Sequence, residues 1–509
     1  MKKVFKILLT TVVIIATTVA CGDEFLELDP VDQVTEAGFF RTEGDADAAL
    51  ASTYDMLQKY GGFENEFLTK LEWLPVGDML MQESPADQAL ESLQWDVDNG
   101  RFSAVWSRHY TGIARANTVI QRIDGIEATD EAKTLIESQA KFLRALFYFS
   151  LARTYGDVPL ILEEPTADTD FNVSRAPLSD VWAQVESDLT DAIAGLPVEW
   201  DDADKGRASR TSALALLAKV HLYQEEWEQA VQFSEQLIDL NVHGLTENYR
   251  DAFRKENEHN EEDVFSVQYR DTNAGGWGEG RDGHFLGSRS APRGIGADLA
   301  PFGGWSNWVP TPQWVSAFET NDDGEIIDSR YDGMVLGPGE THPEVEFTMP
   351  DTLNAGFTST GYVLTKFWFG PNPNNSIYSG QNIPVIRYAE VLLNYAEALN
   401  EVGRGNDAID ALNIIRERAD LEPLSYDMTQ GEILDAVFHE RRIELFWEQS
   451  FFSDLNRRGR YMDFIRENRP DYDELPTDAP YLQQSPIRFP IPLNELDNNP
   501  NMTQNEGYS

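Results

Sequence analysis

Two stretches of the chain, residues 212–240 and 387–419, repeat one helix-turn-helix pattern. In each, an apolar helical segment runs through a short polar turn into a second helical segment, which is typical of the tetratricopeptide unit of roughly 34 residues. A single pair cannot bury its own apolar face, so several pairs must stack. Small residues stand twelve positions apart in both stretches, which lets paired helices approach closely: Ala218 with Ala230, and Ala396 with Ala408.

Helical periodicity in the first half of the chain and in its C-terminal third indicates two further pairs. We therefore predict a mostly α-helical fold, in which four tetratricopeptide-like pairs scaffold a loop-rich, variable face. The helix that ends near Tyr155 should stop at Gly156, and Pro159 prevents it from resuming. The four predicted pairs are 45–60 with 102–123, 131–155 with 178–193, 212–222 with 227–240, and 387–402 with 406–419.

The block between the third and fourth pairs is different in composition. It is rich in Gly, Pro, Asn and aromatic residues and shows little helical period, apart from short strand-like runs at Val264–Tyr269 and Gly361–Phe369. A stretch this long without regular structure inside a compact protein is usually functional. We predict one domain over residues 45–509, with helical repeats at 45–240 and 387–465 and a variable insert at 241–386.

The first twenty residues read as an export signal. Lysines at positions 2, 3 and 6 precede an apolar run, Leu8–Ala16, that is too short to span a bilayer as a stable anchor. Small residues then lead to Cys21, as in a bacterial lipobox, and the chain has no other cysteine with which to form a disulfide. We predict lipidation at Cys21 and a membrane tether over 21–44; a plain signal peptide with an incidental cysteine is the alternative.

The charge balance excludes one class of partner. The chain carries a net charge of −47, and removal of residues 1–20 leaves 37 basic against 87 acidic residues, a net charge of −50. Such a field repels phosphate backbones and anionic membrane surfaces. We therefore predict no nucleic-acid partner and favour a neutral ligand over an anionic one.

No catalytic signature is visible in the sequence. The chain has no Gly-x-Ser-x-Gly elbow and no phosphate loop, and His439-Glu440 lacks the second histidine of a zinc protease. We predict a non-enzyme without a cofactor, although a carboxylate pair of the glycoside hydrolase type is not readable from sequence. Residues 202–206 and 321–324 faintly resemble calcium loops without the spacing of an EF-hand. Solvated turns are the favoured interpretation, with a structural calcium ion as the alternative.

Two loop regions, 67–100 and 271–311, collect aromatic and polar side chains. Tryptophan rings offer flat platforms for the C–H faces of sugars, and Asp, Asn or Arg side chains can bind the hydroxyl groups. The alternative for each loop tryptophan is burial in the core, which is the interpretation we favour for the helical residues Trp182, Trp227 and Trp447. The candidate ligand-binding residues are Trp73, Asp78, Trp95, Trp277, Arg281, Trp305, Asn307 and Trp308.

Five stretches, in this order along the chain, resemble the SusD/RagB family of outer-membrane nutrient-binding lipoproteins: 106–120 (WSRHYTGIARANTVI), 140–160 (AKFLRALFYFSLARTYGDVPL), 387–400 (RYAEVLLNYAEALN), 440–459 (ERRIELFWEQSFFSDLNRRG) and 489–507 (FPIPLNELDNNPNMTQNEG). The resemblance implies a surface lipoprotein that sits as a lid over a SusC-type TonB-dependent barrel and captures glycans for import. A peptide-binding lid and a pure scaffold are the alternatives. We interpret Arg441, Arg442 and Glu444 as structural ion-pairing residues on one helix.

Overall fold

A computed structural model describes residues 40–59, 67–81, 84–166, 169, 171–271, 283–351, 356–372, 377–448 and 450–508. Helices make up most of the regular structure within these ranges. Across the same ranges, none of the helices combines the length and the apolar character needed to cross a bilayer. Cys21 lies outside the described residues.

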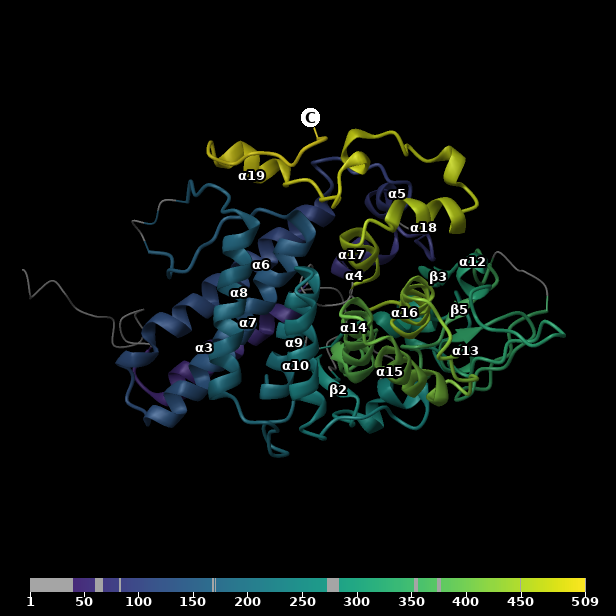
Figure 1. Cartoon of the computed structure of the whole chain (residues 1–509), viewed down its shortest axis with the longest axis horizontal. Coiled ribbons are helices and arrows are strands. Elements are labelled where there is room, and N and C mark those ends of the chain that lie inside the picture. Colours follow the sequence, from purple (N-terminus) through teal and green to yellow (C-terminus); the bar gives the residue numbers. More distant parts are fainter. Residues whose placement is uncertain are drawn as a thin grey trace, which may run out of the picture.

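The four predicted helix pairs are all present, and the helices of each pair pack against each other (Figure 1). Successive pairs are also in contact, through α6 with α7, α8 with α9, and α10 with α14. The result is a continuous row of helices, as the stacking argument requires. The pairs are α3 (Glu43–Gln58) with α6 (Gly100–Arg122), α7 (Asp130–Tyr155) with α8 (Leu178–Gly195), α9 (Arg210–Tyr223) with α10 (Trp227–Ile238), and α14 (Tyr388–Glu401) with α15 (Gly405–Arg418).

Local sequence signals set the ends of these helices. Thr42 and Ser209 close capping boxes at the starts of α3 and α9, where the side chain of each accepts a hydrogen bond from the third residue of its helix. At the other end of α7, Gly156 adopts a φ of 78°, a conformation that costs glycine little. The predicted stop at Gly156 is therefore confirmed.

The remaining elements are short. Further helices follow α15 and fill the region between α3 and α6: α4 (Phe67–Trp73), α5 (Pro85–Glu91), α16 (Gln430–Glu444), α17 (Phe451–Arg457), α18 (Tyr461–Asn468) and α19 (Leu493–Asn498). The insert holds α11 (Leu286–Ser290), α12 (Pro312–Val315), α13 (Arg330–Met334), β2 (Asp263–Val267), β3 (Trp308–Pro310), β4 (Val335–Leu336), β5 (Val363–Leu364) and β6 (Ile383–Arg387). Single-turn helices lie at Ile123–Gly125 (η2), Tyr249–Phe253 (η3), Lys255–Asn257 (η4), Pro301–Gly303 (η5), Tyr472–Glu474 (η7) and Pro480–Gln483 (η8).

Three antiparallel strand pairs connect distant parts of the chain. Strand β2 pairs with β6, so the start of the insert lies beside its end. Strand β4 pairs with β5 inside the insert. Strand β1 (Met79–Met81) pairs with β3, with Leu80 opposite Val309. This last pair brings together the two loop regions in which the sequence places its candidate binding residues.

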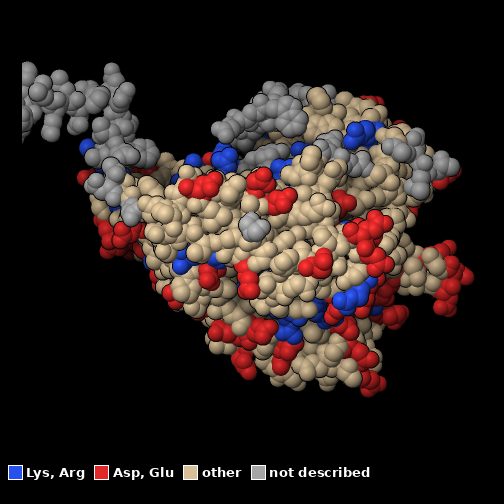
Figure 2. Space-filling model, turned by 90° about the horizontal axis from the view of Figure 1, so that it is seen from above, with Lys and Arg blue, Asp and Glu red and all other residues tan. Residues whose placement is uncertain are grey.

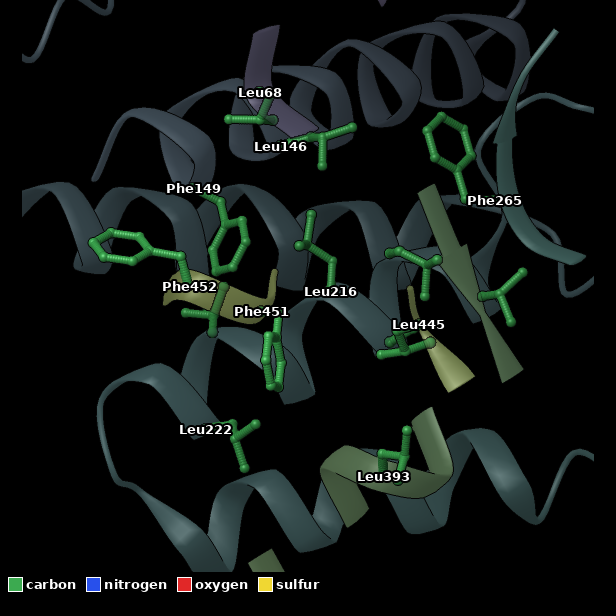
Figure 3. Packing of buried hydrophobic residues seen from close by; sticks show 14 of the residues in the cluster. Leu68, Leu146, Phe149, Leu216, Leu222, Phe265, Leu393, Leu445, Phe451 and Phe452 are labelled. Carbon is green, nitrogen blue, oxygen red and sulfur yellow. The ribbon is translucent and has the colours of Figure 1, made fainter. Parts of the chain in front are cut away.

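The main core lies where helices from both ends of the chain meet. In Figure 3, Phe149 of α7 and Leu216 of α9 lie near Phe451 and Phe452 of α17. All four side chains are buried. Because a filled interior tolerates little change in volume, the C-terminal helices belong to the scaffold as much as the N-terminal pairs do.

The C-terminal segment closes over the N-terminal helices (Figure 1, yellow). The backbone N–H of Phe489 donates to the carbonyl of Thr154 at 3.1 Å, and the Asn505 amide donates to the carbonyl of Tyr155 at 2.9 Å. Further along, Tyr508 stacks on Tyr481 with ring centroids 4.7 Å apart. The last residues of the sequence are therefore part of the packed structure.

Charged residues form a buried network beneath the insert. Arg387 pairs with Glu262, Glu444 and Glu448, and Arg418 donates to Glu444 at 2.6 Å. Buried charges of this kind are stable only when they are paired and hydrogen-bonded. The charged residues of α16 follow the same rule.

The ion pairs made by α16 differ from those predicted within one helix. Arg441 pairs with Asp454 of α17, Arg442 with Asp78, and Glu444 with Arg387. The structural interpretation of these residues is confirmed, but their partners lie on other elements because α16 is enclosed by neighbours on several sides.

The outer surface reflects the acidic composition. The face drawn in Figure 2 carries acidic side chains in many places, with fewer basic side chains among them. Several exposed acids pair with nearby basic residues, as Asp202 does with Lys205 at 2.8 Å and Asp204 with Arg207 at 2.9 Å. The first of the two calcium-like loops is thus a turn whose carboxylates already have cationic partners.

Asp454 should make stability depend on pH at the acid end. Burial raises the pKa of this carboxyl, but Arg441 and Arg457 outweigh that effect and hold the pKa at about 2. A carboxyl whose pKa is depressed by folding stabilises the protein above the pKa of the unfolded chain, near 4, and the contribution is lost as the pH falls towards 2. From a shift of about two units we expect Asp454→Asn to cost roughly 2 kcal/mol at pH 7.

Urea unfolding of the parent and of Asp454→Asn at pH 7, 5, 4 and 3 checks this expectation. The difference between the two proteins should be constant from pH 7 to 5 and should shrink below pH 4. Asp463→Asn, at an exposed position on α18, is the control and should show little difference at any pH. A gap that persists unchanged at pH 3 would contradict the assignment.

Candidate functional site

Three of the predicted tryptophan platforms are core residues. Trp73 and Trp308 are completely buried, and Trp95 is 2% exposed. Trp73 stacks on Phe451 at 5.1 Å between ring centroids, and Trp308 lies 4.7 Å from Trp447. A ring without exposed area cannot support a sugar, so the prediction is wrong for these three residues.

Two polar residues that the sequence predicts to bind the ligand are also buried. Asp78 is 1% exposed and accepts two hydrogen bonds from the Arg442 guanidinium, at 2.6 and 2.8 Å. Asn307 is fully buried, and its backbone N–H donates to the carbonyl of Arg289 at 2.8 Å. The Asp78 side chain joins its segment to α16, and the Asn307 side chain has no exposed surface to offer a ligand.

The pairing of β1 with β3 explains these corrections. The two loop regions do meet, as a shared site would require, but they meet as a buried ribbon beneath the surface. Of the eight candidates, Trp305 alone among the described residues keeps an exposed part of its ring. Trp277 and Arg281 lie outside the described residues, and their role stays a prediction.

Trp305 and Phe302 form an aromatic ledge on the insert. Phe302 is 56% exposed, and its ring meets that of Trp305 edge-on with centroids 6.3 Å apart. The guanidinium of Arg289 lies 5.5 Å from the Trp305 ring and so supports the tryptophan. The backbone N–H of Trp305 donates to the carbonyl of Ser288 at 2.8 Å, which fixes the loop to α11.

The backbone of this loop is strained where the ledge is made. Phe302 has a φ of 53°, in the left-handed region that large side chains rarely adopt. Gly304 follows with a φ of 71°, and an added Cβ atom there would lie only 2.0 Å from the carbonyl oxygen of Pro292. Conformations of this kind persist only where the surroundings enforce them and are frequent at binding sites.

A cleft of about 510 Å³ opens beside the ledge, starting at Pro301. Its size lies within the range of small-ligand sites. It combines apolar rings with hydroxyl, amide and carboxylate groups, the mixture that binds sugars. Its lining residues are Lys255, Glu256, Asp271, Pro301, Phe367, Phe369, Gly370, Pro371, Asn372, Ser379 and Gln381.

Phe369 provides the aromatic wall of the cleft. Its ring is half-buried, with the guanidinium of Arg250 4.3 Å from the ring centroid and that of Arg254 at 6.0 Å. These cation–π contacts hold the ring in place at the cleft. Phe367 beside it is almost fully buried and belongs to the floor of the cleft.

The charges in the cleft largely compensate one another. Lys255 pairs with Asp271, whose second oxygen accepts a hydrogen bond from the backbone N–H of Gly380 at 2.9 Å. Burial raises the pKa of Asp271, but the hydrogen bonds from Lys255 and Gly380 outweigh it and keep the pKa below its usual value. With Lys255 neutralised and Glu256 exposed, the cleft favours a neutral ligand over an anionic one.

Sequence reasoning did not find Phe302, Phe369 or Asn372. A signal was present, since Phe369 opens the run Phe-Gly-Pro-Asn, a composition typical of turns.

A second hollow of about 650 Å³ lies among α18, η7 and η8, where the guanidinium of Arg466 lies 5.8 Å from the centroid of the Tyr472 ring. We favour the first cleft because it lies in the insert and adjoins the exposed ledge.

Comparisons with known proteins identify the family. A model described as "SusD family" matches residues 261–508, and one described as "Starch-binding associating with outer membrane" matches residues 24–222. A SusD-like protein P25 from Formosa agariphila is 26% identical over 96% of both chains.

Solved structures agree with these matches over nearly the whole length. A SusD superfamily protein from Bacteroides vulgatus has a TM-score of 0.78 at 24% identity, over 92% of this chain and 100% of the other. A laminarin-binding SusD-like protein has a TM-score of 0.75 at 29% identity, with the same coverage. Together with the two family models, these similarities show that the chain belongs to the SusD/RagB family.

Proposed function

We propose that this chain is a glycan-binding surface lipoprotein that captures an oligosaccharide or polysaccharide at the insert cleft and delivers it to a SusC-type TonB-dependent barrel. The observation that supports this proposal most is the cleft of about 510 Å³, in which the Phe369 ring lies beside neutral hydrogen-bonding groups. Pro301, the residue before Phe302 of the ledge, also lines this cleft. Lipidation at Cys21 would hold the protein at the outer membrane.

The relatives support this class of ligand. One similar structure is described as laminarin binding, and one matching family model as starch-binding and associated with the outer membrane. Laminarin and starch are neutral glucans, in agreement with the compensated charges of the cleft. Both descriptions name a binding role, which supports the prediction that the chain is not an enzyme.

Weak binding is the expected regime. A stacked aromatic ring buries 150 Å² or more, worth roughly 4 kcal/mol before losses at about 25 cal/mol per Å². Immobilising a flexible sugar and its partners offsets much of this gain. Two or three rings therefore give about −4 to −7 kcal/mol, a dissociation constant from millimolar to micromolar. Such an affinity suits capture followed by release to a transporter.

Substitution of two partly exposed rings, Phe369 and Trp305, tests the site. We expect Phe369→Ala and Trp305→Ala each to weaken glycan binding about tenfold, because each removes roughly one stacking contact. Affinity electrophoresis in gels that contain laminarin, starch or other neutral polysaccharides measures the change. Thermal unfolding of each variant should stay close to the parent, which separates lost binding from lost structure.

Two further variants serve as controls. Phe171→Ala removes a ring that is 66% exposed but lies outside the cleft, and it should leave binding unchanged. Tyr472→Ala tests the hollow near α18. Retained binding in Phe369→Ala and Trp305→Ala, with loss in Tyr472→Ala, would move the site to that hollow. A panel of peptides tested in parallel should show no binding to the parent protein.

A further inference from the structure

Three side chains of types that commonly bind metal ions lie close together on the helical scaffold. None of them lines the cleft of the insert. They are Glu186 of α8, His221 near the end of α9, and Glu226 in the turn before α10. One ligand atom from each lies within 4.8 Å of the other two. Over the ranges that the structure describes, this is the one group of three or more His, Cys, Asp or Glu side chains with such geometry.

The imidazole of His221 is held in a fixed orientation. Its side chain is largely buried, and its ring stacks on Phe233 with centroids 5.3 Å apart and planes 5° from parallel. Its Nδ1 atom lies 2.6 Å from a carboxylate oxygen of Glu226. The stacking and the Nδ1 contact together fix the position of the imidazole beside the carboxylate.

The two glutamates are also positioned by their surroundings. Glu225 adopts a φ of 60°, and this turn lets the backbone N–H of Glu226 donate to the carbonyl of His221 at 2.9 Å. The amide of Gln224 donates to Glu186 at 2.6 Å. Each carboxylate is thus placed by a contact other than the candidate metal.

Among the described residues, the two candidate carboxylates differ from most other acids nearby in their lack of a lysine or arginine partner. In the described part of the chain, neither Glu186 nor Glu226 forms an ion pair with a lysine or arginine. The acids of the 202–206 turn differ, since Asp202 and Asp204 pair with Lys205 and Arg207. Two carboxylates around one imidazole form a negatively charged donor set, which a divalent cation would help to neutralise.

We propose that Glu186, His221 and Glu226 bind one Zn²⁺ ion, which links α8 to the turn between α9 and α10. Zinc accepts imidazole nitrogen together with carboxylate oxygen and is satisfied by three protein ligands and a water molecule. Calcium prefers six to eight oxygen ligands and fits this set poorly. Bound zinc replaces the Nδ1 to Glu226 hydrogen bond, and small rotations of the two glutamates bring their oxygens into coordination distance.

Zinc titration of the untagged full-length protein, stripped with chelator and measured at pH 7.5, tests the site. Isothermal titration calorimetry should give one Zn²⁺ per chain with a dissociation constant in the micromolar range or tighter. His221→Gln and Glu226→Gln should each weaken zinc binding at least tenfold, as should Glu186→Gln. Glu228→Gln, exposed on the adjacent first turn of α10, is the matched control and should bind as the parent does.

Thermal unfolding provides a second readout. Zinc should raise the Tm of the parent and of Glu228→Gln, and it should not raise the Tm of the three ligand variants, because an ion that binds the folded state alone stabilises it. Absence of zinc binding by the parent would overturn the proposal. Zinc binding that is equal in all variants, or calcium binding in place of zinc, would overturn it as well. Glycan binding by the insert is expected to be the same with and without zinc, so the two proposals fail separately.

Discussion

Glu444→Gln should lower the free energy of unfolding by about 3–5 kcal/mol, the usual cost of breaking a buried ion pair by removing one partner. Glu444 is completely buried and accepts from Arg387 at 2.9 Å and from Arg418 at 2.6 Å. Burial opposes the ionisation of Glu444, but Arg418, Arg387 and Arg330 outweigh it and hold its pKa far below the usual value. The amide keeps the shape and removes the charge, so the cost measures the unpaired arginines.

Urea unfolding at pH 7, followed by tryptophan fluorescence and by circular dichroism, measures this loss. Glu417→Gln makes the same chemical change at an exposed position of α15 and should shift stability by less than about 0.5 kcal/mol. A near-neutral Glu444→Gln would show that the arginines find other partners or water, and that the network contributes little.

Trp95→Ala should cost about 3–5 kcal/mol, the range for removing a large aromatic side chain from a core. The Trp95 ring lies 4.7 Å from Phe489 and 5.8 Å from Phe452, and its Nε1–H donates to the carbonyl of Leu90 at 3.3 Å. The two ring partners, Phe489 and Phe452, belong to the C-terminal segment and to α17. Its removal would therefore open a cavity between the first and last parts of the chain.

The comparison with Trp305→Ala makes this test specific. Both substitutions remove an indole from a region that the sequence predicts to be a binding loop, but only Trp305 keeps exposed ring area. Thermal unfolding should show a large loss for Trp95→Ala and a small one for Trp305→Ala, with the reverse order for glycan affinity. Equal losses of stability would mean that Trp305 is as much a core residue as Trp95.

The helical scaffold was predictable because its signals are local. Periodicity and the paired alanines of 212–240 and 387–419 act within one helix pair, and Gly156 acts at one helix end, so each can be read without knowledge of the rest of the chain. The burial of Trp308 depends on β1 meeting β3, more than two hundred residues apart in sequence. No local pattern contains that pairing.

Local sequence patterns also fail to predict which side chains line the candidate site. The sequence does not single out Phe369, because it ends the strand-like run Gly361–Phe369, in which aromatic side chains are ordinarily interior. It lines the cleft because Lys255, Asp271 and Gln381 come together around it from separate segments. Tryptophan content in loops points to the insert, in which the proposed cleft lies, but the solvent access of individual rings is a property of long-range packing.

The hydrogen bonds from Phe489 and Asn505 to the end of α7 bear on how such a molecule reaches its native state. The helices of the early pairs consist of local segments, but Trp95 is fully covered only when Tyr481 and Phe489 pack against it. Contacts of such large sequence separation slow the final step of folding. The core around Trp95 is therefore complete only once the C-terminal segment has packed against the end of α7.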